Sequence, residues 1–215
     1  MRIDYHNDEQ AKNLIQNAKN IAIMPSKSGG LDCFSAAVGL YELLVAQDKS
    51  CKILYPGKFP EGADDITDEN AVISSFTARE LTVSIDFSGM HEAKAHYDVD
   101  GDTLNLKLGP VSKDFDPELR VRSKLHMGFD YDLIITIGAW ELEDFGYVYD
   151  ELSYEFTKTT ILNIDNSNKN TRYGSVNIID PQAESLTLLI LRKAPFWELE
   201  LNKKAAHILL SSISQ

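Results

Sequence analysis

Residues 21–56 read IAIMPSKSGGLDCFSAAVGLYELLVAQDKSCKILYP, and the class of the fold can be inferred from this segment. An apolar run at 21–25 is followed by a Ser/Gly-rich loop at 26–30 and by a long apolar segment for which Asp32 is the expected helix cap. A second apolar run follows at 51–56. Strand, loop, helix and strand in this order predict a βαβ unit, whose two strands pair in parallel through a right-handed crossover.

The chain outside this stretch repeats the alternation of apolar strands and amphipathic helices. Residues 131–140, YDLIITIGAW, form an almost wholly apolar run, as expected of a central strand that is buried on both faces. Residues 8–19 carry apolar side chains at helical spacing. The remaining patterns predict strands at 159–165 and 176–180, and helices at about 142–157, 182–193 and 202–213. We therefore predict an α/β fold, a parallel sheet flanked by helices.

Between residues 80 and 108 the apolar period changes to two, the period of strands that bury one face. Three segments show it, LTVSIDF, EAKAHYDV and DTLNLKL, and Asp100-Gly101 is expected to form a type I′ hairpin turn. We predict an antiparallel hairpin or meander inserted at about 76–110, followed by a linker at 113–129. Residues 1–215 are then one domain with a β insertion.

Composition limits the partners of the chain. Lys and Arg number 21 against 33 for Asp and Glu, so the formal net charge of −12 repels phosphate backbones and makes extended nucleic acid an unexpected partner. Cys33 and Cys51 lie in apolar stretches, which favours buried thiols in a reducing compartment. No apolar run approaches the ~18 residues of a membrane span. We expect a cytoplasmic protein without a membrane partner.

Candidate site residues follow three of the expected strands. In an open parallel sheet, ligands bind beyond the carboxyl ends of the strands. The residues in question are therefore 26–32, 138–143 and 165–170.

The last of these segments carries a family resemblance. Residues 159–185, TTILNIDNSNKNTRYGSVNIIDPQAES, resemble the DHH phosphoesterases, of the oligoribonuclease and phosphoadenosine-phosphate phosphatase type, with degenerate motifs. Residues 21–44 resemble the first motif and helix of that family, and 131–146 resemble the strand of its second motif. The matching positions in the last segment are Ile164, Asp165, Asn168, Tyr173, Gly174, Val176, Asn177, Asp180, Pro181 and Ala183.

The resemblance implies a site for two divalent cations, usually manganese, that activates water against a phosphodiester or pyrophosphate. Carried over position by position, two metal-ligand carboxylates are retained, Asp32 and Asp165. Neutral residues stand at the lost ligand positions, which are Ser26, Gly30, Gly138, Asn166 and Ser167. Two carboxylates cannot hold a metal pair. The implied protein is therefore a non-catalytic binding or scaffolding relative without a cofactor, and without the substrate-binding domain that follows in the family.

Two other functions stay open. One is an active phosphoesterase for short oligonucleotides or nucleotides, which would use manganese or magnesium at a site rearranged around Asp32, Asp165 and one of Glu141, Asp86 or a residue beyond position 215. Glu143 and Asp144 follow the same strand as Glu141, and the three are either displaced ligands or an acidic cluster at the start of a helix. The other is an interaction module, in which the insertion at 76–110 makes a homodimer or binds a protein partner.

The Ser/Gly-rich loop has two interpretations as well. Ser26, Lys27, Ser28, Gly29 and Gly30 form either a metal loop that has lost its ligands or a cradle for a nucleotide or phosphate at a helix N-terminus. A cap by Asp32 would occupy the same backbone donors and argues against the cradle.

The turn at 166–168 raises a similar question. Asn166, Ser167 and Asn168 are further candidates for contact with an anion. Asp165 is either a vestigial metal ligand or the acceptor that closes this turn after its strand.

Overall fold

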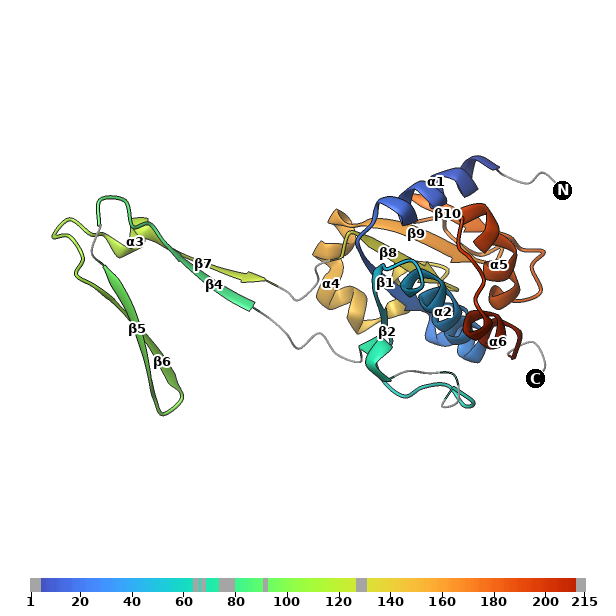
Figure 1. Ribbon diagram of the computed structural model, residues 1–215, viewed down its shortest axis with the longest axis horizontal. Helices are drawn as coiled ribbons and strands as arrows, with labels where there is room; N and C mark the ends of the chain where they lie inside the picture. The colour runs from blue at the N-terminus through green and yellow to red at the C-terminus, as the bar shows by residue number, and fades with distance from the viewer. Residues whose placement is uncertain are drawn as a thin grey trace. The chain divides into compact units, whose positions relative to one another are not determined.

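The computed structural model describes residues 5–63, 66, 69–73, 80–90, 93–126 and 131–211. It divides into two compact units, one comprising Met1–Ser75 with Phe129–Gln215 and the other Phe76–Gly128. We call them the α/β unit and the insertion unit and describe each by itself (Figure 1).

The α/β unit is built on a six-stranded parallel sheet, which confirms the predicted fold class. The strands follow the order β10-β9-β8-β1-β2-β3, and every pair runs parallel. β8 and β1 stand in the middle of this order, and their side chains are therefore buried on both faces. The strands are β1 Asn20–Pro25, β2 Ser50–Leu54, β3 Val72–Ile73, β8 Leu133–Ile137, β9 Thr160–Asp165 and β10 Val176–Ile179.

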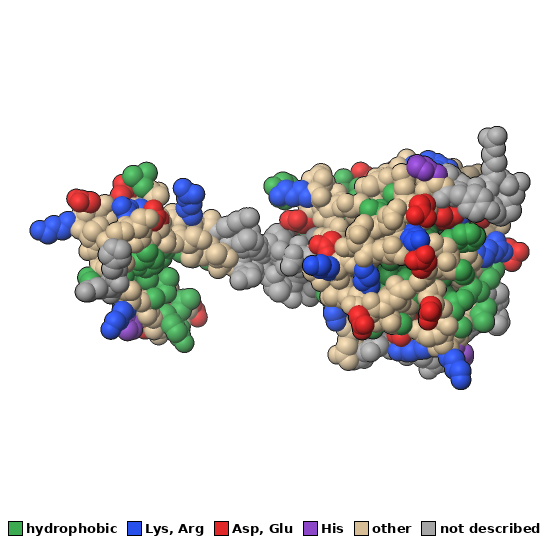
Figure 2. All heavy atoms as spheres, turned by 45° about the horizontal axis from the view of Figure 1, so that its top comes forward, with side chains coloured by type: hydrophobic (Ala, Val, Ile, Leu, Met, Phe, Trp, Pro, Cys, Tyr) green, Lys and Arg blue, Asp and Glu red, His purple; other side chains and the backbone are tan. Residues whose placement is uncertain are grey.

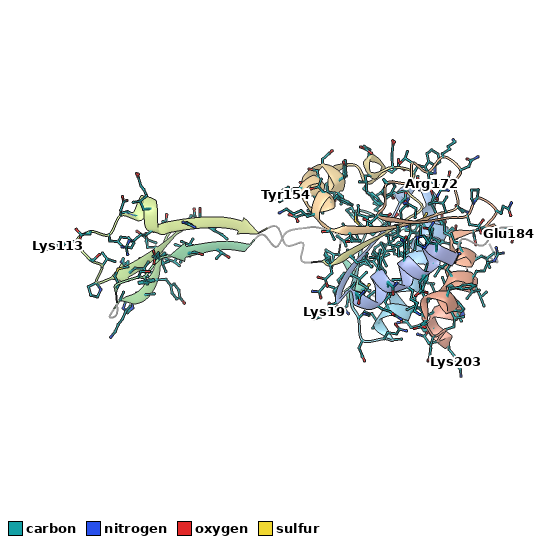
Figure 3. All side chains as sticks on the ribbon, turned by 90° about the horizontal axis from the view of Figure 1, so that it is seen from above. Lys19, Lys113, Tyr154, Arg172, Glu184 and Lys203 are labelled. Carbon is teal, nitrogen blue, oxygen red and sulfur yellow. The ribbon has the colours of Figure 1, made fainter. Side chains whose placement is uncertain are left out.

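Helices cover both faces of this sheet. Figure 3 shows Tyr154 of α4 on one side of the sheet and Lys203 of α6 on the other. The α-helices are α1 Tyr5–Asn17, α2 Gly30–Val45, α4 Tyr147–Lys158, α5 Leu186–Lys193 and α6 Lys203–Ser211. Short 3₁₀ helices are η1 Lys27–Gly29, η2 Glu69–Ala71, η3 Leu142–Phe145 and η4 Ala194–Trp197.

The main core lies between the sheet and α2. Ten residues of this 16-residue helix are buried, and α2 contacts both α5 and α6. Alternate strand residues such as Ile21, Ile135 and Leu162 point into this core. Each such side chain contributes about 1.5–3 kcal/mol when fully buried. The intervening apolar positions, Ala22 and Ile134 among them, are buried but lie outside this hydrophobic cluster, because side chains alternate between the faces of a strand.

The insertion unit differs from the predicted meander. β4 (Glu80–Ile85) pairs with β7 (Val121–His126), while β5 (Lys94–Asp100) pairs only with β6 (Thr103–Gly109) within the described residues; both pairs are antiparallel. The short helix α3, Pro117–Arg120, precedes β7. The predicted linker at 113–129 therefore contains a helix and a strand, and the unit extends beyond residue 110 to Gly128.

The hairpin turn is shifted by one residue from the prediction. Asp100 pairs with Thr103, so Gly101 and Asp102 form the two-residue loop. Gly101 has φ +56°, whereas Asp102 is not among the residues with positive φ. A type I′ turn needs positive φ at both positions, so the glycine at the first position fits a type II′ turn instead.

No helix among the described residues is long and apolar enough to cross a membrane.

Candidate functional site

The three loops singled out from the sequence meet at one edge of the sheet. β1, β8 and β9 are neighbours in parallel, so their carboxyl ends lie side by side. Two backbone hydrogen bonds continue this register past the strand ends: Ser26 N–H donates to Ile137 O (2.8 Å) and Gly138 N–H donates to Ile164 O (2.9 Å). The residues after these strands are thus held next to one another, as predicted for an open parallel sheet.

Asp32 does not cap the helix that contains it, contrary to the prediction. α2 begins at Gly30 with Gly29 as its N-cap, so Asp32 lies inside the first turn. Its carboxylate reaches the first turn of α5, where Leu186 N–H donates to Oδ2 (2.8 Å). Thr187 donates twice to Oδ1, from N–H (3.1 Å) and from its hydroxyl (3.0 Å). The carboxylate therefore satisfies the orphan donors at the N-terminus of a neighbouring helix.

Asp165 closes a turn, which is the structural one of its two predicted roles. Its side chain is buried, and Oδ1 accepts hydrogen bonds from Asn166 N–H (2.8 Å) and Ser167 N–H (3.2 Å). Oδ2 accepts a third from Asn170 Nδ2 (2.9 Å). Burial raises the pKa of this carboxyl, and the three hydrogen bonds oppose the rise.

The Cys33 side chain fills the space between two glycines of the site. A Cβ atom at Gly29 or at Gly138 would overlap the Cys33 Sγ, and one at Gly138 would also lie 2.8 Å from Leu186 Cδ1. Gly138 has φ +70°, which side chains rarely tolerate. Burial raises the pKa of the Cys33 thiol to about 12, so the thiol is neutral. A ligand carboxylate at position 138 has no room in this packing.

An amide network occupies the adjacent part of the edge. Asn163 Nδ2 donates to Asn170 Oδ1 (2.8 Å) and to Asn177 Oδ1 (3.0 Å). Tyr173 donates its hydroxyl to Thr136 Oγ1 (2.8 Å), and burial raises the pKa of the phenol. These groups are neutral at pH 7, so the network adds no charge that would hold a cation. The signal for it was a polar residue, Asn163, within an apolar strand.

The Ser26–Gly30 loop folds onto itself. Ser26 is buried and its Oγ lies 2.8 Å from Ser28 Oγ, while Ser28 N–H donates to Ser26 Oγ. Lys27, Ser28 and Gly29 are exposed. Asp32 accepts hydrogen bonds from α5 and not from the N-terminus of α2. It therefore does not compete with an anion for the backbone N–H groups at the start of α2. The cradle for a nucleotide or phosphate stays a prediction.

The remaining turn candidates have local partners or face solvent. Asn166 Nδ2 donates to Ala183 O (3.2 Å), and Ser167 Oγ accepts from Lys169 N–H (3.1 Å). Asn168 is exposed.

The carboxylates considered as replacements accept hydrogen bonds from their own loops, and one of them, Asp144, also lies near enough to Asp165 to help raise the pKa of that carboxyl. Asp144 accepts hydrogen bonds from Trp140 N–H (2.7 Å) and Glu141 N–H, at the start of η3. Asp86 belongs to the insertion unit, where its carboxylate accepts from Ser88. Within the described residues, no group of three or more His, Cys, Asp or Glu side chains is arranged to hold a metal ion.

Comparisons with known proteins show the fold. No family model matches the chain, and no curated protein matches its sequence. Among solved structures, the chain is similar to the crystal structure of an exopolyphosphatase-related protein from Bacteroides fragilis, with a TM-score of 0.66 and 14% identity. The match covers 97% of this chain and 49% of that one, so the chain spans about half the length of the structure that it matches. The chain thus shares the α/β fold of that structure.

Proposed function

We propose that the protein is a non-catalytic relative of the DHH phosphoesterases, which acts by binding or scaffolding. The observation that carries the proposal is the set of three hydrogen bonds from Leu186 and Thr187 to the carboxylate of Asp32. The carboxylate that the resemblance assigns to a metal instead joins α2 to α5.

The second retained carboxylate supports the same conclusion. Both oxygens of Asp165 accept hydrogen bonds from the turn that follows β9. A metal ion at Asp165 would compete with these donors for the carboxylate oxygens. Among the described residues, no group of three or more His, Cys, Asp or Glu side chains is arranged to complete its ligand set. Two-metal hydrolysis needs several anionic or imidazole ligands to hold cations about 3.5–4 Å apart. The amides and hydroxyls at this edge are poor substitutes.

The packing around Gly138 also supports the proposed loss of catalysis. Gly138 stands at a lost ligand position, and the Cys33 and Leu186 side chains occupy the space that a larger residue would need. An aspartate introduced at position 138 would therefore clash with Cys33 and Leu186 before it could act as a ligand.

A hydrolysis assay tests the proposal. The full chain is incubated with manganese and, in separate reactions, with short oligonucleotides, a dinucleotide, 3′-phosphoadenosine phosphate and inorganic polyphosphate. We expect no turnover above the rate without protein. Turnover that is lost in both Asp165→Asn and Asp32→Asn, but kept in Glu143→Gln at the same edge, would establish the active alternative with a rearranged site.

A further inference from the structure

The β5–β6 hairpin has one apolar face and one polar face. Tyr97 stands directly opposite Leu106, and Val99 opposite Leu104, so these four side chains share a face. Their exposed fractions are 76%, 51%, 66% and 66%. Figure 2 shows hydrophobic side chains gathered on the insertion unit.

Polar side chains on the other face of the hairpin contact one another across the two strands. Lys107 forms an ion pair with Asp98 (2.7 Å), and Asn105 Nδ2 donates to the same carboxylate (3.2 Å). His96 lies opposite Lys107 on this face. Asp98, Asn105 and Lys107 therefore have partners across the strands, whereas the apolar side chains lie open to solvent.

The β4–β7 ribbon repeats this division. Leu81 and Val83 alternate with Thr82 and Ser84, and they are 61% and 43% exposed. Ile85, next on the same face, is partly buried. Both ribbons of the insertion unit thus alternate apolar and polar side chains, the pattern of strands that bury one face. The apolar face of each ribbon is nevertheless largely exposed. A two-stranded ribbon is marginally stable in water unless it packs against another element.

We propose that these apolar faces form a homodimer interface, in which the ribbons of one chain stack on those of a second copy. Stacking two ribbons about 10 Å apart gives a four-stranded sandwich, and three or more strands with a hydrophobic face suffice for independent stability.

Charge favours a second copy as the occupant. Residues 76–128 contain seven Lys and Arg against nine Asp and Glu, a net charge of −2, which leaves −10 of the total −12 for the rest of the chain. Two insertion units can therefore approach with little repulsion, whereas the α/β units repel one another. The apolar face presents no charge to a nucleic acid or to an acidic protein.

The area also fits, provided that both ribbons take part. The seven-residue strands of the β5–β6 hairpin offer a face of about 24 Å by 10 Å, and the six-residue strands of the β4–β7 ribbon offer one of about 20 Å by 10 Å. One such face is well below the roughly 600–1,000 Å² per partner of a specific interface, and two with projecting side chains approach the lower end. We therefore expect a dimer that forms in the micromolar range.

Sedimentation velocity of the full chain from about 1 to 100 µM tests the interface. We expect the weight-average mass to rise from one chain to two. The double variant Tyr97→Glu/Leu106→Lys places an opposite-charge pair across the same two strands and should remain monomeric. The control His96→Glu creates a matching pair with Lys107 on the polar face and should dimerise like the unaltered chain. A monomer throughout this range, larger oligomers, or equal dimerisation of both variants would overturn the proposal.

Cross-linking locates the contact. Cys33 and Cys51 are buried, so Val99→Cys supplies an accessible thiol on the apolar face and His96→Cys supplies one on the polar face. With a short bismaleimide, we expect a covalent dimer from Val99→Cys and monomer from His96→Cys. The reverse pattern would contradict the proposed face. The interface does not depend on the proposed loss of catalysis, because mass and cross-links are measured without any substrate.

Discussion

Thr187 donates two hydrogen bonds to Asp32 Oδ1, from its backbone N–H at 3.1 Å and from its hydroxyl at 3.0 Å. The two residues are 155 positions apart in the chain, in the first turns of α5 and α2. A carboxylate at a helix N-terminus is favoured by both the orphan N–H groups and the helix dipole. This contact therefore joins α5 to α2, the helix that connects β1 to β2.

Asp32→Ala should lower the free energy of unfolding by about 1–3 kcal/mol, because it leaves the partly buried donors of Leu186 and Thr187 without their acceptor. Urea unfolding followed by circular dichroism measures the change. Glu184→Ala is the control, since Glu184 is an exposed carboxylate just before α5 and should change stability by less than about 0.5 kcal/mol. Equal stability losses in the two variants would contradict the role given to Asp32.

The stability contributed by Asp165 should fall as pH rises. Burial raises the pKa of its carboxyl above 3.8 in the folded state, so the folded chain binds this proton more tightly than the unfolded chain. The free energy of unfolding of the unaltered chain, relative to Asp165→Asn, should therefore decrease above pH 3.8 until the folded pKa is passed. Urea unfolding at several pH values from 4 to 7 measures it, and a difference that grows with pH would be inconsistent with this account.

Asp132 provides a control of opposite sign. Hydrogen bonds from the N–H groups of Asn20 and Lys19 lower the pKa of its carboxyl. Its contribution is present above the unfolded pKa and is lost as pH falls through the folded pKa. The difference between the unaltered chain and Asp132→Asn should therefore increase as pH rises towards 3.8 and be level by about pH 5, so the series is extended below pH 4 for this variant.

Gly138→Ala should destabilise the fold by about 1–3 kcal/mol, because its Cβ would overlap the Cys33 Sγ at a backbone φ of +70°. Gly30→Ala is the matched control: it has φ +55°, and nothing lies within 4 Å of its added Cβ. It should cost the backbone term alone, so Gly138→Ala should be the more destabilising of the two variants by the added overlap with Cys33. In a Cys33→Ala background, Gly138→Ala should cost less than in the unaltered chain. A cost no larger than that of Gly30→Ala, with no coupling to Cys33, would rule out the packing argument.

Cys33 and Cys51 should not react with a thiol reagent in the native chain at pH 8. Burial raises the pKa of each thiol to about 12, so the nucleophilic thiolate is scarce as well as shielded. Absorbance after addition of a disulfide reagent should show two reactive thiols per chain in denaturant and none without it. Rapid modification of either thiol under native conditions would show that it is accessible.

Local patterns in the sequence were sufficient for five of the six strands of the α/β unit, whereas the two-residue strand β3 was not predicted because it is too short to show a period. β1, α2 and β2 follow from apolar runs separated by a glycine loop, and β8 follows from a continuous apolar run. The three loops that meet at the carboxyl edge follow from the rule for parallel sheets.

Long-range pairing accounts for what the sequence did not reveal. β7 was missed because its alternation is short and rich in charge, and its partner β4 lies about forty residues earlier. The partner of Asp32 is on a helix 155 residues away, so local spacing suggested a cap for α2 instead. The fit of Cys33 against Gly138 depends on side-chain packing between two loops, which no motif records.

Anomalous scattering from crystals of the full chain soaked in manganese tests the central claim most directly. We expect the carboxylate of Asp32 to keep its contacts with Leu186 and Thr187, and no anomalous peak within about 3 Å of either Asp32 or Asp165, the range of a metal–oxygen bond. A peak that bridges Asp32 and Asp165, with the Thr187 contact broken, would contradict the account.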